Sequence, residues 1–128
     1  MKIFGFPPIA CPTFKKINSI KEVQNTSAKD ILYFPQTLSH SLNLGAFLQE
    51  NHTQYAVQIQ DVQGFILFAN LGAKYALIAQ DPLVYQTLAK EYVLDIEVLK
   101  IITSQEEIQT YALKGIDGVV FKNLLAEK

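Results

Sequence analysis

A chain of 128 residues has the length of one domain, with room for one substantial core. Its formal net charge of -1 excludes the strong positive field typical of proteins that bind nucleic acid or acidic membranes, so we expect neither partner. Charged residues make up 18% of the chain, against about 25% in soluble domains, which predicts that apolar surface is covered in a homo-oligomer.

Residues 1–12 are predicted to form an irregular arm, because prolines and a glycine interrupt any regular element. Phe4 and Phe6 are expected to dock on the domain, residues 13–128, or on a second subunit. The single cysteine, Cys11, allows no internal disulfide and favours a reducing, cytoplasmic location.

The remaining chain alternates short apolar runs with amphipathic segments. Runs of β-branched and aromatic residues without polar alternation predict strands that are buried on both faces. The predicted strands are 13–17, 31–34, 55–59, 75–79, 98–102 and 116–121. The predicted helices between them begin at Ser19, Thr37, Asp61, Asp81 and Ser104. Imperfect alternation places the strand 55–59 nearer an edge of the sheet.

Local signals mark the start of several helices. Ser19 and Ser104 are each followed three residues later by a glutamate, Glu22 and Glu107. This spacing is that of a capping box, in which hydroxyl and carboxylate bond to amides that the first helical turn leaves free. Asp81 is followed by proline, a second pattern typical of a helix start.

Alternating strands and helices predict an α/β fold: a single three-layer domain with a mostly parallel, open sheet of about five or six strands. Crossover helices are expected on both faces, as in Rossmann-like or flavodoxin-like proteins. Right-handed crossovers also allow a partial (β/α) barrel-like sheet. The open sheet is favoured, since about six strands are too few to close an eight-stranded barrel.

Ligands of open α/β sheets bind beyond the carboxyl ends of the strands. The candidate ligand-binding residues at these ends are Asp61, Asp81, Thr103, Ser104 and Lys122. The two aspartates could hold a divalent cation, with Thr103 and Lys122 beside a phosphoryl group. Both aspartates also fit the role of helix caps, and this interpretation is favoured.

The order of polar residues, with Thr103 and Lys122 after the last two strands, resembles the layout of response-regulator receiver domains. Those domains carry an acidic pair after their first strand, whereas here Phe34 leads into Pro35 and Gln36. The resemblance is therefore one of layout and implies no phosphoryl acceptance.

Residues 115–121, GIDGVVF, resemble a late strand of phosphate-binding (β/α)₈ barrels, in which glycine and aspartate precede an aliphatic strand and a Gly-Ser turn. Phe121, Lys122 and Asn123 replace that turn, so the sequence lacks the glycine amides that would cradle a phosphate. Asp117 is interpreted as the start of a strand.

Other motifs of catalysis are missing from the sequence. It contains no glycine-rich nucleotide loop, and His40 and His52 are too far apart to form a helical metal-binding pair. Ser39 and Ser41 lack the glycines of a nucleophile elbow. No catalytic residue, metal site or cofactor is therefore assigned.

These observations favour a non-catalytic, self-associating binding or interaction module with a protein or small-molecule partner. The alternative is an enzyme, or a domain that binds a phosphorylated metabolite or nucleotide at the carboxyl ends of the strands. A degenerate fragment of a barrel enzyme would share the predicted fold.

Overall fold

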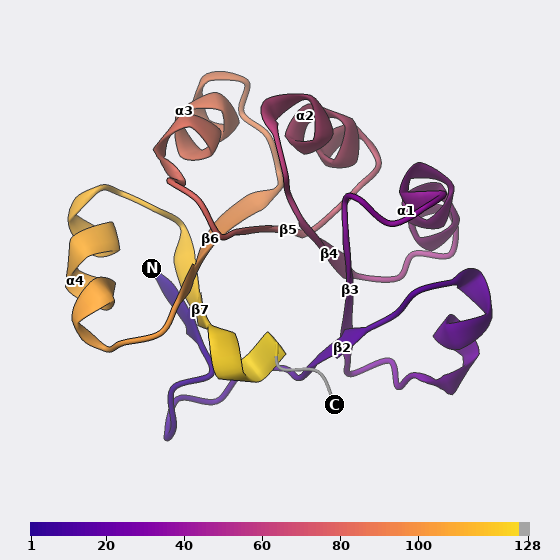
Figure 1. The fold of residues 1–128 in the computed structure, drawn as a ribbon, viewed down its shortest axis with the longest axis horizontal. Coiled ribbons are helices and arrows are strands. Elements are labelled where there is room, and N and C mark those ends of the chain that lie inside the picture. Colours follow the sequence, from indigo (N-terminus) through magenta and orange to yellow (C-terminus); the bar gives the residue numbers. More distant parts are fainter. Residues whose placement is uncertain (126–128) are drawn as a thin grey trace.

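The computed structural model describes residues 1–125 and contains one parallel sheet of seven strands (Figure 1). The strands are β1 (Lys2–Phe4), β2 (Phe14–Lys16), β3 (Ile31–Pro35), β4 (Tyr55–Gln58), β5 (Tyr75–Ile78), β6 (Glu97–Ile102) and β7 (Gly118–Phe121). The α-helices are α1 (Ser41–Glu50), α2 (Val62–Asn70), α3 (Leu83–Glu91) and α4 (Glu106–Leu113). Two 3₁₀ helices complete the described chain, η1 (Ile20–Asn25) and η2 (Lys122–Leu125).

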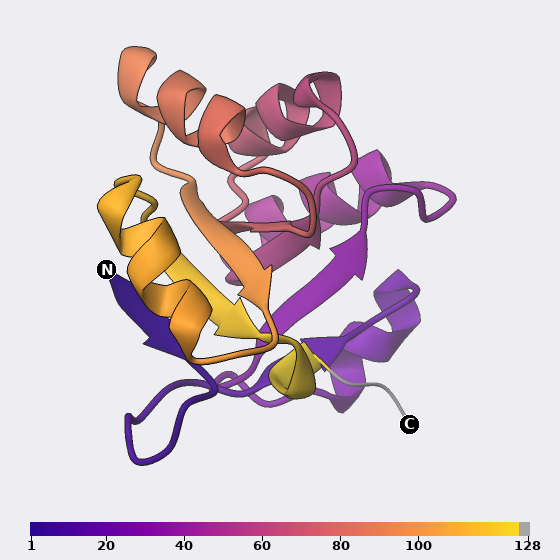
Figure 2. The same ribbon diagram turned by 60° about the vertical axis from the view of Figure 1, so that its left-hand side comes forward.

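The strands follow one another across the sheet in the order β1-β7-β6-β5-β4-β3-β2. Because the chain steps in one direction from β2 to β7, right-handed crossovers place every helix on the same face. Figure 1 shows α1 to α4 along the convex outside of a curled sheet, and Figure 2 shows η2 beside the arrowheads of β6 and β7. The parallel, open α/β sheet is confirmed. Its helices cover one face rather than two, and its strand order is that of the partial-barrel alternative.

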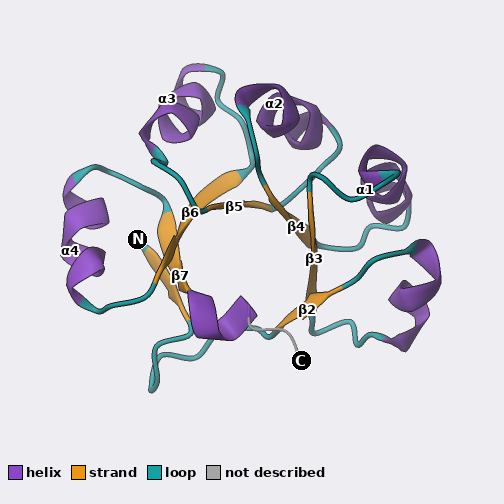
Figure 3. Ribbon diagram, in the orientation of Figure 1, coloured by secondary structure: helices purple, strands orange, loops and turns teal. Residues whose placement is uncertain are grey.

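The strand β1 corrects the expectation that residues 1–12 are irregular. Lys2 pairs with Gly118, so β1 adds to the sheet beside β7. A three-residue strand is too short to show a hydrophobic period. Figure 3 shows a loop, rather than a helix, between β1 and β2. Phe4 is 5% exposed and Phe6 stacks on Phe121, so the predicted docking of both rings on the domain is confirmed.

The strand β4 lies between β3 and β5, so its predicted place near an edge is wrong. The one polar side chain after Tyr55 is that of Gln58, the last residue of the strand. This side chain lies at the open carboxyl end of the sheet, where a polar group stays accessible to solvent. Ala56 and Val57 before it are fully buried, as expected for a central strand.

The helix α1 begins at Ser41, later than the predicted start at Thr37. A turn precedes it, in which His40 adopts a left-handed conformation with φ of 64°. Gly45 lies within this helix because a side chain there would meet Phe68 at 3.0 Å and the hydroxyl of Tyr55 at 3.1 Å. The glycine therefore allows α1 to approach the sheet closely.

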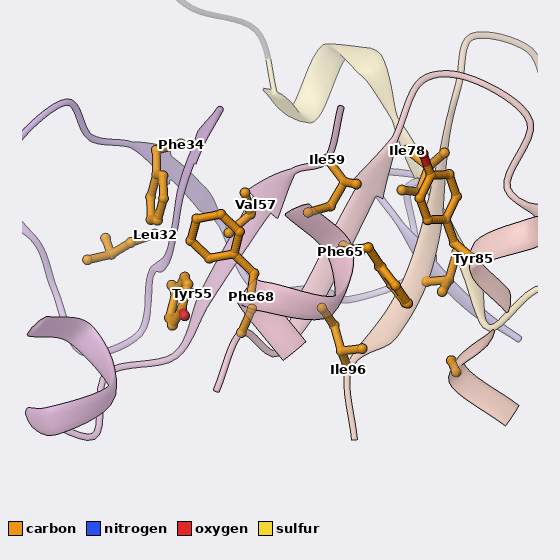
Figure 4. Close-up of a cluster of buried hydrophobic side chains, with 14 of the residues drawn as sticks. Leu32, Phe34, Tyr55, Val57, Ile59, Phe65, Phe68, Ile78, Tyr85 and Ile96 are labelled. Atoms are coloured by element: carbon orange, nitrogen blue, oxygen red, sulfur yellow. The ribbon is translucent and has the colours of Figure 1, made fainter. Parts of the chain in front are cut away.

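The convex face carries the larger core, in which aromatic rings fill the space between strands and helices (Figure 4). Phe34 and Tyr55 stack with their ring centres 5.7 Å apart, and Phe68 meets Phe34 edge-on at 5.9 Å. Phe65 meets Tyr85 edge-on at 5.3 Å. These contacts attach α2 to β3 and α3 to α2.

The concave face is filled by side chains of the sheet itself. Four rings, called the ring cluster below, meet there: Phe4, Phe14, Tyr33 and Tyr75. Phe4 and Phe14 come from the two edge strands, and their ring centres are 5.7 Å apart. Within residues 1–125 no backbone ladder joins β1 to β2, so rings rather than hydrogen bonds bring the two edges of the curled sheet together.

The short helix η2 lies over the concave side. The hydroxyl of Tyr33 donates a hydrogen bond of 2.6 Å to the backbone oxygen of Leu125, and Leu125 is 8% exposed. The end of the described chain is thereby attached to β3, on the far side of the curl from β7. In the described part of the chain, every helix is too short or too polar to cross a membrane.

Candidate functional site

A groove opens on the concave side at the carboxyl ends of β3 to β7, and we call it the mouth groove. It has two lobes with volumes of about 650 and 620 Å³, which share Gln58, Ala79 and Ile101. The first lobe is completed by Pro35, Ile59, Gln60, Leu77 and Gln80. The second lobe is completed by Thr103, Lys122, Asn123 and Leu125. Each lobe has the size of a small-molecule site.

The hollow has a simple origin in the alternation of side chains along the strands. Leu77 faces the concave side, so Ala79, two residues later, faces the same way. Its methyl group lies between the longer side chains of Gln58 and Ile101 in the shared part of the groove. A large residue at position 79 would fill the space that these neighbours enclose.

Three glutamines line the first lobe: Gln58, Gln60 and Gln80. The side-chain oxygen of Gln36, beside the lobe, accepts from the backbone amide of Gln60 at 2.6 Å. The amide of Gln80 donates to the hydroxyl of Tyr85 at 3.0 Å. The side chains of Gln60 and Gln58 have no hydrogen bond to any part of the described chain, and of these two only Gln58 lines both lobes. Its carboxamide is therefore available to a bound molecule.

A lysine that sequence reasoning missed supports the rim from the helix side. Lys100 is 8% exposed, and its Nζ donates to the backbone oxygens of Ala79 and, at 3.1 Å, Gln80. Burial lowers the pKa of this ammonium group. The bonds hold the end of β5 in place. A charged residue inside the apolar run 98–102 was the sequence signal for this role.

The structure brings two of the candidate residues together. Thr103 and Lys122 line the second lobe, while Asp61, Asp81 and Ser104 are not among the residues that line the groove. Lys122 is exposed and has no ion pair within residues 1–125. In the described part of the chain, it is the one ammonium group that lines either lobe.

Both candidate aspartates serve as helix caps, as predicted. Asp61 accepts from the backbone amide of Gly64 and from the side chain of Gln36, each at 2.9 Å. These bonds, that of Gln36 first, hold the pKa of Asp61 below its usual range. Asp81 accepts from the backbone amide of Leu83 at 3.0 Å.

The two predicted capping boxes form only in part. Glu107 accepts from the backbone amides of Thr103 and Ser104, both at 2.9 Å, and these bonds lower its pKa. The hydroxyl of Ser104 points to the same carboxylate, at 3.3 Å, instead of capping a backbone amide. Glu22 likewise accepts from the amide of Asn18 at 3.2 Å. The carboxylate half of the box is present at Ser104, whereas Glu22 bonds to the amide of the residue before Ser19, and each carboxylate fixes the turn before its helix.

Amides, one hydroxyl and one ammonium group of the described residues line the groove, together with apolar side chains. Among residues 1–125, no carboxylate or imidazole, the usual groups for proton transfer, lines it. Among residues 1–125, no three His, Cys, Asp or Glu side chains are placed to hold a metal ion.

The fold defines the class of this protein: an α/β protein with one curled, parallel sheet, helices on the convex face and a groove at the carboxyl ends of the strands. Comparison with models of known protein families finds no match, and comparison with curated proteins finds none either.

Proposed function

We propose that this protein is a non-catalytic binding module that takes a small molecule into the mouth groove. The observation that carries the proposal is the hollow at Ala79, which is lined by polar groups without a carboxylate or imidazole. The centre of the concave face is filled by rings, whereas this end is open to solvent.

A fragment screen by NMR tests the proposal on the full chain. Fragments that bind should shift the amide signals of residues around the groove, such as Gln60 and Gln80. An Ala79→Phe variant fills the hollow and should lose these shifts, while its spectrum elsewhere stays the same. Fragments that bind both proteins equally, or that bind only away from the groove, would contradict the proposal.

A second candidate is a domain that binds phosphorylated metabolites or nucleotides, or an enzyme acting on them. Thr103 and Lys122 favour it, because a hydroxyl and an ammonium group in one lobe suit an anionic group. Sugar phosphates, with and without Mg²⁺, should then raise the melting temperature. A ligand at a hundred times its dissociation constant adds about 2.7 kcal/mol of stability.

Matched variants test separately whether the protein binds a phosphoryl group and whether it binds a cation. Lys122→Gln should abolish the effect of a sugar phosphate if the ammonium group binds it. Asp61→Asn combined with Asp81→Asn should abolish an effect of Mg²⁺ if the carboxylates hold a cation. Because both aspartates cap helices, this double variant also needs comparison without Mg²⁺.

We also propose that the protein self-associates through the outer ends of α3 and α4. Tyr92, Val93 and Leu113 are 66%, 85% and 80% exposed, and Lys90 bonds to the backbone oxygen of Gly115 between these helix ends. Light scattering should give a dimer or larger mass that falls to the monomer mass in Tyr92→Ser combined with Leu113→Ser. A monomer mass for the native chain would contradict this proposal.

The single cysteine supports a cytoplasmic location, in which thiols stay reduced. Cys11 is partly buried beside the ring cluster. Fractionation of cells that express the tagged chain would test the location.

A further inference from the structure

We infer that the mouth groove recognises a planar, uncharged heterocycle through an amide-type edge, and that the side chain of Gln58 forms hydrogen bonds to this edge. This inference rests on the proposed binding function and names the class of ligand. The edge in question is that of a lactam, in which an N–H donor lies beside a carbonyl acceptor, as in a uracil or guanine base.

The position of Gln58 makes it the centre of the groove. It belongs to both lobes, and in the sheet it lies between Pro35 of β3 and Leu77 of β5. Both neighbours line the first lobe with apolar surface. The carboxamide is therefore the one polar group in a strip of apolar side chains across the middle strands.

The hydrogen-bonding capacity of this carboxamide is unused by the protein. A glutamine side chain offers two N–H donors and an oxygen that accepts. Gln36 and Gln80 use these groups in hydrogen bonds to the protein, whereas the side chain of Gln58 bonds to no part of the described chain. Gln58 is partly exposed, so solvent can reach its carboxamide in the open groove.

A ligand that covers Gln58 displaces this solvent, so it must offer both a donor and an acceptor in return. A ligand without them leaves buried polar groups unsatisfied, which is the strongest source of selectivity in such sites. A side-by-side N–H and C=O pair is the partner that a carboxamide bonds with two hydrogen bonds.

The apolar walls of the groove restrict the shape of the ligand beyond its lactam edge. Ala79 leaves the hollow beside Gln58, and Ile101 forms its other side. These surfaces suit the flat face of a ring. Among residues 1–125, Lys122 is the charged residue of the lining and belongs only to the second lobe, so no charged side chain of the described chain lines the first lobe beside Gln58.

A matched pair of probes tests the edge directly. Uridine and 3-methyluridine differ at the ring nitrogen, where the methyl group removes the donor of the lactam edge. Guanosine and 1-methylguanosine form a second pair. In NMR titrations of the full chain, we expect an unmethylated probe to shift the groove amides and its methylated partner to bind at least about tenfold more weakly.

Variants assign this difference to Gln58. Gln58→Met keeps the length of the side chain and should reduce binding of the unmethylated probe by about tenfold or more. It should also remove the difference between the two probes. Gln109→Met, on the exposed side of α4, is the matched control and should bind as the native chain does. Native-like spectra would show that each variant is folded.

The outcomes distinguish the ligand class from the proposed function. Equal binding of methylated and unmethylated probes, or binding unaffected by Gln58→Met, overturns the inference. Failure of all four nucleosides overturns it as well. If other fragments still bind the groove and lose binding in Ala79→Phe, the proposed function stands without this ligand class. If nothing binds the groove, both fail.

Discussion

The ring cluster and the mouth groove lie on the same concave face, yet one is filled and the other is open. In the ring cluster, Phe14 packs against Phe4, Tyr33 and Tyr75 with ring centres 5.7 to 6.3 Å apart. At the carboxyl ends of the same strands, Ala79 is exposed to solvent. The large side chains are therefore concentrated where the curled sheet must be held together.

We therefore expect the ring cluster to determine the stability of the fold and the mouth groove to determine ligand binding. The ring cluster replaces the hydrogen bonds that would close a complete barrel, so its side chains are needed for the shape of the sheet. The mouth groove depends on that shape but adds little to it, since its lining residues other than the buried Ile59, Leu77 and Leu125 are small, polar or partly exposed. Substitutions in the ring cluster should therefore lower the stability of the fold. Substitutions in the mouth groove should instead change ligand binding and leave stability almost unchanged.

The largest expected effect is that of Phe14→Ala. Removing this ring from between the two edges should lower the free energy of unfolding by about 3–5 kcal/mol, because a buried cavity remains. Urea denaturation measures the loss. Ala79→Phe, in the groove, should change stability by about 0.5 kcal/mol or less. Similar losses in the two variants would show that the comparison is wrong.

A second test concerns the strand that brings Phe4 into the cluster. An added methyl group at Gly118 would lie 2.7 Å from a side-chain carbon of Leu99 and 2.8 Å from the backbone oxygen of Lys2. Gly118→Ala should therefore push β1 away from β7 and cost about 1–3 kcal/mol. Hydrogen exchange should become faster in residues 2–4 and remain unchanged in β4. Unchanged exchange in β1 would contradict its pairing with β7.

Local signals were sufficient to predict most of the elements. The apolar run 116–121 contains β7, and the run 98–102 covers all of β6 except its first residue, Glu97. Asp61 begins a helix as predicted, because its carboxylate bonds to an amide within the same turn. Such interactions join residues close in sequence, so the sequence displays them directly.

The arrangement of layers could not be predicted in the same way. A strand whose two faces are both buried has the same apolar sequence whether helices cover both faces or the sheet curls over its own side chains. Val98 faces the helices and Leu99 faces the concave core, and both are fully buried. Strand order and the pairing of β1 likewise depend on contacts between distant residues.

Part of the candidate site follows from the sequence. Thr103 and Lys122 come directly after strands, and both line the groove, whereas Asp61, Asp81 and Ser104 do not. Gln58 was not a candidate, because a glutamine at the end of a strand carries no local signal of a groove. Only the tertiary structure shows that Gln36 and Gln80 bond to the protein while Gln58 does not bond to the described chain.

A smaller effect is expected where η2 meets the concave face. Tyr33→Phe keeps the ring in the cluster but removes the bond of 2.6 Å to the backbone oxygen of Leu125. Stability should fall by about 1 kcal/mol. Faster hydrogen exchange in η2, with unchanged exchange in β3, would show that the hydroxyl holds η2 over the groove. Equal loosening of both would mean that the ring itself was disturbed.

The smallest effect concerns the rim of the second lobe and depends on pH. The amides of Thr103 and Ser104 lower the pKa of Glu107 in the folded protein. A carboxyl group with a lowered folded pKa stabilises the protein above its unfolded pKa, and this stability is lost as the pH falls through the folded value. Glu107→Gln should therefore cost less than about 1 kcal/mol at neutral pH and almost nothing at acidic pH.

Melting temperatures of both proteins across the acidic range measure this difference. Glu106→Gln removes the same charge from the neighbouring residue, whose side chain has no bond to these amides in the described chain. Its difference from the native protein should therefore change less with pH. If the Glu107→Gln difference stayed constant down to acidic pH, the negative charge of Glu107 would add nothing to its bonds with the amides of Thr103 and Ser104.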